Sequence, residues 1–330
     1  MKHFLYILLL LSMGGFLASC GPKDEPSGYM TTPFDLQTPS HLPVMKIPED
    51  NPLTIEGVEL GRMLYYDPIL HETQDHACAS CHEQSTSFTT YSSNALIHVN
   101  LGYANKFLWN GAVEGSLEDI MLFEVKDFFK ADLEVINADP IYRDKFKKAF
   151  GVEEITNKEL AYALAQFERT KFSGYSKYDL YRIGATQFTA QEIRGLNLYF
   201  SEKGDCFHCH GTSLLTNNDF HNTGLDANPD QGRMEVTSDP KDLGKFKTPT
   251  LRNIALTAPY MHDGRFSTLE EVVEFYSTGL INSPTIDPLM KQINNGGLQL
   301  TTEEKADLVA FLQTFTDTAF VNNPALSDPF

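Results

Sequence analysis

Apolar residues recur at helical spacing in three stretches of the chain, and a capping box opens each of them. The boxes are Thr156-x-x-Glu159, Thr189-x-x-Glu192 and Thr301-x-x-Glu304. The apolar positions that follow each box form one face of an expected helix: Leu160, Ala163, Leu164 and Phe167; Ile193, Leu196 and Phe200; and Leu308, Phe311, Leu312 and Phe315. Helix signals outnumber strand signals throughout, so we predict a mainly α fold with these stripes in the core.

Irregular segments separate the expected helices, and the longest, residues 217–249, is rich in Gly, Pro, Asn and Asp. Two short stretches resemble each other, Gly61-Arg-Met-Leu-Tyr-Tyr-Asp67 and Gly195-Leu-Asn-Leu-Tyr-Phe-Ser201. Such a weak internal repeat indicates a duplicated domain. About 280 residues follow a proline-rich segment near the N-terminus, which is enough for two domains of ordinary size. We place these domains at residues 49–180 and 181–330.

Four of the five cysteines lie in two copies of one motif, Cys78-Ala79-Ser80-Cys81-His82 and Cys206-Phe207-His208-Cys209-His210. C-x-x-C-H is the attachment signature of c-type haem, in which both thiols bond to the porphyrin and the histidine ligates the iron. Structural zinc and disulfides are the alternatives, but neither needs both histidines. We therefore expect two cytochrome c-like haem domains with long irregular loops, each holding one covalent haem c.

The N-terminus carries an export signal. Residues 1–19 combine Lys2, an apolar run and small residues before Cys20, which is typical of a bacterial lipoprotein signal peptide. Cys20 is then lipidated, and residues 20–48 form a tether from the membrane to the folded body. The alternative is ordinary signal cleavage near Ala18 with Cys20 as a stray thiol. Both interpretations place the protein in the periplasm.

The formal net charge of −18 argues against nucleic acid and is compatible with a basic redox partner. The alternative is that the negative charge serves only to keep the protein soluble.

Several stretches resemble the bacterial di-haem cytochrome c peroxidase and MauG family. They are the two haem motifs, Phe107-Leu-Trp-Asn-Gly111, and Thr248-Pro-Thr-Leu-Arg-Asn-Ile-Ala-Leu-Thr-Ala-Pro-Tyr-Met-His-Asp-Gly264. The resemblance implies that His82 is the proximal ligand of a peroxide-reacting haem and His210 that of an electron-transfer haem.

The resemblance also implies a second ligand for the His210 haem. The family's ligand position falls on Tyr276, and a tyrosine there is typical of the MauG-like subclass. Met261 and Met290 are the alternative ligands, and a core tyrosine is the alternative role for Tyr276.

At the reactive haem, the resemblance places a glutamate as acid and base for peroxide cleavage. Counting along the sequence without gaps places this glutamate at Glu124, with Asp127 as the second choice. The alternative is that Glu124 is a solvated carboxylate on a helix surface without a catalytic role. Trp109, the only tryptophan, falls where the family has an aromatic residue between the haems.

Three oxygen donors match an interdomain calcium site of the family: Asn94, Thr257 and Pro259. Only eleven residues separate His82 from Asn94, so there is no room for the loop whose histidine blocks the reactive haem in some members. His98, the one histidine nearby, is expected to pack near the pocket.

We therefore predict a peroxidase that reduces hydrogen peroxide with electrons from a small redox protein. The alternatives are MauG-like oxidation of a protein substrate and electron transfer without catalysis. Homodimer formation is expected from the family.

Overall fold

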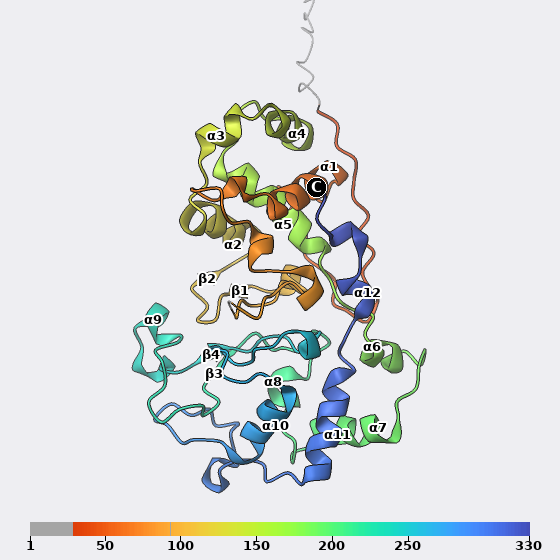
Figure 1. Cartoon of the computed structure of the whole chain (residues 1–330), viewed down its shortest axis with the longest axis vertical. Coiled ribbons are helices and arrows are strands. Elements are labelled where there is room, and N and C mark those ends of the chain that lie inside the picture. The colour runs from red at the N-terminus through yellow and green to blue at the C-terminus, as the bar shows by residue number, and fades with distance from the viewer. Residues whose placement is uncertain (1–28, 93) are drawn as a thin grey trace, which may run out of the picture.

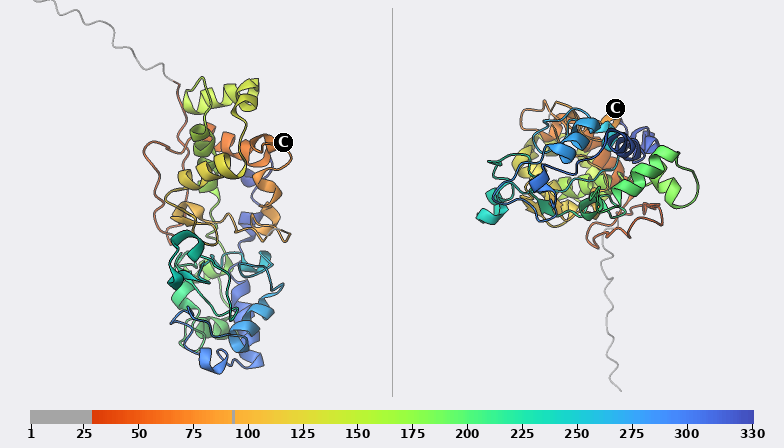
Figure 2. Two further views of the ribbon diagram at one scale, coloured as in Figure 1. Left: turned by 90° about the vertical axis from the view of Figure 1, so that its left-hand side faces the viewer. Right: turned by 90° about the horizontal axis from the view of Figure 1, so that it is seen from below.

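The computed structural model describes residues 29–92 and 94–330 and forms an elongated body of two halves stacked end to end (Figures 1 and 2). The predicted signal peptide, Cys20 and the first part of the tether lie outside the described residues. Within the described part, no helix has the length and apolar character needed to cross a membrane.

The N-terminal half is a helical bundle built around one apolar core. Its helices are α1 (Ile55–Tyr66), α2 (Leu117–Phe123), α3 (Leu133–Ala138), α4 (Pro140–Phe150) and α5 (Asn157–Thr170). Helix α2 continues directly into a π-helical turn at Glu124–Phe128. Helices α1 and α5 pack along each other in the centre of this core.

The C-terminal half has a second core, in which α7 and α11 pack against each other as α1 and α5 do in the first. Its helices are α6 (Lys177–Arg182), α7 (Ala190–Tyr199), α8 (Phe207–His210), α9 (Met234–Thr237), α10 (Leu269–Thr278) and α11 (Thr302–Gln313). The fold is therefore mainly helical, as predicted.

Both ends of the described chain lie against the body (Figure 1). After α11, helix α12 (Thr318–Val321) leads back to the N-terminal half, where Phe320 and Leu326 join the first core. Residues 29–48 do not stand away from the body either, because His41 Nε2 lies 3.3 Å from Asp179 Oδ1 and Leu42 is buried. The described part of the predicted tether thus covers both halves.

Two short hairpins meet where the halves join (Figure 1). In the first, β1 (Lys106–Phe107) pairs antiparallel with β2 (Val113–Glu114), with Phe107 opposite Val113. In the second, β3 (Phe220–His221) pairs antiparallel with β4 (Phe246–Lys247).

All three predicted capping boxes are confirmed, at the starts of α5, α7 and α11. The apolar residues predicted to face the core from α5 and α11 are buried. The prediction for α7 is only partly correct, because Phe200 is 38% exposed. The fully buried positions of α7 are instead Gly195 and Tyr199.

The internal repeat corresponds to two matching helix crossings. A Cβ atom added to Gly61 of α1 would lie 2.0 Å from the carbonyl oxygen of Ala163 on α5. One added to Gly195 of α7 would lie 2.1 Å from the carbonyl oxygen of Asp307 on α11. Only glycine permits this backbone approach, so each repeated glycine sets the distance between the two central helices of its half.

We predict that Gly61→Ala and Gly195→Ala each lower the free energy of unfolding by about 1–3 kcal/mol, because the new methyl group forces the helices apart. Urea denaturation of the haem-loaded protein measures this. Asn197→Ala, at an exposed position of α7, is the control and should stay within about 0.5 kcal/mol. Unchanged stability of both glycine variants would contradict the close crossings.

Candidate functional site

The histidines of the two haem motifs are held in the same way. His82 follows a 3₁₀ turn at Cys78–Ser80, and His210 ends α8. The Nδ1 atom of His82 lies 2.9 Å from the carbonyl oxygen of Phe88, and that of His210 lies 3.0 Å from the carbonyl oxygen of Leu215. A carbonyl only accepts, so each Nδ1 carries the proton and each Nε2 keeps its lone pair for a metal.

A tyrosine of the internal repeat supports each histidine from behind. The Tyr65 hydroxyl donates to the carbonyl oxygen of His82 at 3.1 Å, and the Tyr199 hydroxyl donates to that of His210 at 3.0 Å. These are the fifth residues of the two repeated stretches. Each copy of the repeat thus supplies a tyrosine that holds the backbone of the histidine in its own haem motif.

The protonation states suit haem attachment. Desolvation lowers the pKa of His210 to about 4 and that of His82 well below its usual value, so both rings are neutral ligands at neutral pH. The four thiols of the two motifs form no disulfide.

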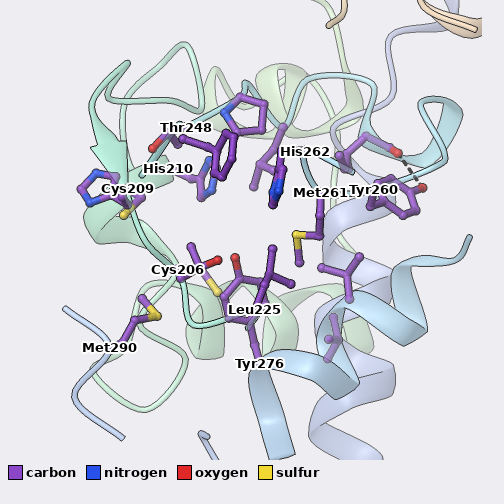
Figure 3. Close-up of a pocket in the computed structure, with 18 of the residues that line it drawn as sticks. Cys206, Cys209, His210, Leu225, Thr248, Tyr260, Met261, His262, Tyr276 and Met290 are labelled. Atoms are coloured by element: carbon purple, nitrogen blue, oxygen red, sulfur yellow. Dashed lines mark hydrogen bonds between the residues drawn. The ribbon is translucent and has the colours of Figure 1, made fainter. Parts of the chain in front are cut away.

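A large, mainly apolar cavity opens beside the second motif (Figure 3). The His210 ring enters it from one side, and the hydroxyl end of Tyr276, from α10, points into it from the opposite side. Cys206 and Cys209 lie on its wall. Met261 and Met290 also line this cavity, so all three side chains considered as the second ligand reach it.

Lys247 supplies a positive charge at the same cavity. The residue is 9% exposed, and its ammonium makes no ion pair with a carboxylate of residues 29–92 or 94–330. Desolvation lowers its pKa to about 8. A buried cation without a protein partner suits an anionic ligand group, and haem carries two propionates. The cavity, the thiols, the opposed His210 and Tyr276, and Lys247 together fit a covalently attached haem.

The loop of the first hairpin carries Trp109 to this cavity. The carbonyl oxygen of Trp109 accepts from the backbone N–H of Lys247 at 2.8 Å, and the tryptophan lines the cavity. Arg233, from the other half, donates to the carbonyl oxygens of Asn110 and Gly111 at 3.2 and 2.7 Å. The hairpin of the N-terminal half is therefore anchored beside the second haem motif.

Asn94 forms another link between the halves. Its Nδ2 donates to the carbonyl oxygens of Met261 and His262 at 3.1 and 2.8 Å. Thr257 and Pro259 line the same part of the cavity as Asn94. Among the described residues, none donates a hydrogen bond to Asn94 Oδ1 or to the carbonyl oxygens of Thr257 and Pro259.

The two candidate carboxylates of the first site differ in environment. Glu124 begins the π-helical turn and is partly buried, whereas Asp127 is exposed on the same turn. Burial, with a further contribution from Glu168, raises the pKa of Glu124 to about 7. The charge of Glu124 also adds to the effect of burial in raising the pKa of the Cys78 thiol. Of the two, Glu124 is the one whose charge acts on a thiol of the first haem motif. Single π turns occur frequently at functional sites.

Sequence reasoning expected His98 to pack near the pocket but missed the buried ion pair that holds it next to His82. The His98 ring stacks on the His82 ring with centroids 3.6 Å apart, and Glu168 binds His98 Nδ1 at 3.1 Å and Lys171 at 2.7 Å. The signal was present in α5, where Glu168 and the following Lys171 continue the apolar stripe of Leu164 and Phe167 at helical spacing. Charged residues on a core stripe indicate a buried ion pair.

Sequence reasoning also missed His221 on β3, which borders the cavity beside the second haem motif. Its Nδ1 lies 2.6 Å from Asp287 Oδ2. Hydrogen bonding to Asp287, followed by that to the Cys209 thiol, raises the pKa of His221 to about 10.

Comparison with known proteins agrees with this geometry. Residues 55–187 match the family model described as di-haem cytochrome c peroxidase. The methylamine utilization protein MauG of Methylorubrum extorquens is 32% identical over 288 residues, which cover 81% of this chain and 80% of that protein. The cytochrome c551 peroxidase of Nitrosomonas europaea is 31% identical over 333 residues, covering 94% of this chain and 90% of the peroxidase.

Among solved structures, a MauG-like protein associated with microbial copper homeostasis superposes with a TM-score of 0.81 at 35% identity. The match covers 90% of this chain and 99% of that protein.

Proposed function

Because the chain belongs to the di-haem cytochrome c peroxidase family, we propose that it reduces hydrogen peroxide to water in the periplasm. Each turnover takes up two electrons from a small redox protein and two protons, and releases two water molecules. The observation that carries the proposal is the partly buried Glu124 beside the first haem motif. Relatives named as cytochrome c peroxidases favour this function over oxidation of a protein substrate.

Two covalently attached haems supply the iron-centred redox chemistry of such an enzyme when bound. We assign the reactive haem to Cys78, Cys81 and His82, and the electron-transfer haem to Cys206, Cys209 and His210. In the second site Tyr276 would hold the haem iron together with His210, because its hydroxyl end points into the cavity opposite the His210 ring (Figure 3). With both Tyr276 and His210 holding the second haem, peroxide would react at the first site, where Glu124 is the candidate acid and base.

Glu124 is the proposed acid and base. Its carboxylate takes the proton from one oxygen of the peroxide and returns it to the other oxygen as the bond between them breaks. A group of this kind works best when its pKa lies near the working pH, and burial raises the pKa of Glu124 to about 7. Asp127 is exposed and does not meet this condition.

Trp109 is the proposed stepping stone for electrons between the two sites. It is the residue of the N-terminal half that borders the second cavity from the hairpin loop, and its backbone is bonded to Lys247. An indole ring at this junction would divide the distance between the two haem sites into shorter electron-transfer steps.

We also propose one calcium ion at the junction, held by Asn94 Oδ1 and the carbonyl oxygens of Thr257 and Pro259. All three are hard oxygen donors, as calcium requires. The purified protein is expected to contain one calcium ion per chain by atomic emission, and Asn94→Ala should lose it while the exposed control Asn197→Ala keeps it. Protein that contains no calcium after purification in calcium buffer would contradict the assignment.

Cys20 is the proposed lipidation site, with the protein held at the membrane on its periplasmic side. The lipid anchor and the homodimer stay predictions.

We predict that Glu124→Gln lowers the rate of peroxide reduction by about 100- to 10,000-fold, the usual contribution of a general acid or base. In the unaltered protein the rate should fall as the pH drops through about 7, because the carboxylate then becomes protonated and can no longer accept the proton from peroxide. Stopped-flow measurement of peroxide consumption from pH 5 to 9 tests both statements.

Asp127→Asn is the matched control for this experiment, since it removes a neighbouring carboxylate of the same turn. It should keep both the rate and the pH profile. If Asp127→Asn abolishes the reaction and Glu124→Gln does not, the assignment of the acid and base is wrong.

A further inference from the structure

His98 occupies a defined place beside the proximal ligand of the first haem motif. Its backbone N–H donates to the carbonyl oxygen of Phe88 at 3.1 Å, and the same carbonyl accepts from His82 Nδ1 at 2.9 Å. The two imidazole rings stack with centroids 3.6 Å apart and planes 22° apart. One carbonyl thus fixes the backbone of His98 and the ring of His82 relative to each other.

A buried ion pair holds the His98 ring. Glu168 Oε1 lies 3.1 Å from His98 Nδ1 and 2.7 Å from Lys171 Nζ, and the side chains of Glu168 and Lys171 are 1% and 0% exposed. The Lys171 ammonium also lies 3.2 Å from the centroid of the Tyr65 ring. Desolvating such a pair is costly, and apolar residues of similar size are often as stable, so a purely structural need does not explain its presence.

The C-terminal half carries an apolar residue at the place of His98. The carbonyl oxygen of Leu215 accepts from His210 Nδ1 at 3.0 Å and from the backbone N–H of Leu251 at 3.2 Å. Leu251 therefore makes the same backbone contact beside His210 that His98 makes beside His82.

The residues of the C-terminal half that correspond to Glu168 and Lys171 are also apolar. Asn100 and Asn253, each two residues after His98 or Leu251, have φ angles of 61° and 59°. Their backbone N–H groups donate to the carbonyl oxygens of Lys171 and Phe315, respectively. Phe315 thus corresponds to Lys171, and Leu312, three residues earlier, corresponds to Glu168. The two haem sites share a frame and differ at three adjoining buried positions.

We propose that His98 is a positioning residue for the haem bound at His82, with its ring fixing the plane of the His82 imidazole. Glu168 and Lys171 keep the His98 ring in place. The inference rests on the proposed function, in which this haem is open on its reactive side. A haem with a ligand on each face, such as Tyr276 and His210, is restrained from both sides. Where the protein would ligate the iron only through His82, the orientation of that ring depends on the side chains packed behind it.

The test replaces residues of the N-terminal half by their counterparts from the C-terminal half. The two variants are His98→Leu and the double variant Glu168→Leu with Lys171→Phe. The double variant keeps His98 but removes the ion pair that holds its ring. Because both charged residues are replaced by apolar ones, neither Glu168 nor Lys171 is left as an unpaired buried charge. The measurement is the EPR line width of each ferric haem in the haem-loaded protein, which reports the spread of ligand orientations.

Both variants are expected to broaden the signal of the His82 haem and to leave that of the His210 haem unchanged, so each protein contains its own control. If one variant does not fold, the other still tests the proposal. A signal of unchanged width in the variants that fold would overturn it. The outcome does not depend on turnover: failure of the unaltered protein to reduce peroxide would overturn the proposed function and leave this comparison intact.

Discussion

The hydrogen bond from each ligand histidine to a buried backbone carbonyl is the constraint on which both sites depend. Phe88 and Leu215 supply these carbonyls, and the bond leaves the lone pair of each Nε2 free for a metal. The frame around the bond is equally shared. Gly61 and Gly195 set the helix crossings, and the tyrosine four residues after each glycine bonds to the backbone of the ligand histidine.

Differences placed on this common frame separate the two sites. Behind His82 the protein has a histidine supported by a buried ion pair, and beside its haem motif lies Glu124, whose pKa burial raises. At His210 the corresponding inner positions are apolar, while a tyrosine from α10 points into the cavity opposite the histidine. The duplication therefore explains why there are two haem sites, and the unequal residues explain why the proposed chemistry belongs to one of them.

Local signals predicted a large part of this arrangement. The C-x-x-C-H motifs and the three capping boxes depend on residues within five positions of each other, so the chain alone reveals them. The burial of Gly195 and the exposure of Phe200 were not predicted, because they depend on where α11 crosses α7. The same limit applies to His98, which meets Glu168 from a loop 70 residues away, and to the packing of residues 29–48 on both halves. A charged residue on an apolar stripe, such as Glu168, indicates that it has a buried partner, but no local pattern identifies which distant residue that partner is.

The claim that one haem is closed by Tyr276 while the other is open can be tested directly by EPR of the ferric protein and of Tyr276→Phe. We expect one low-spin and one high-spin haem in the unaltered protein, and loss of the low-spin signal alone in the variant. Two low-spin haems at rest, or a low-spin signal that survives the loss of the Tyr276 hydroxyl, would contradict it.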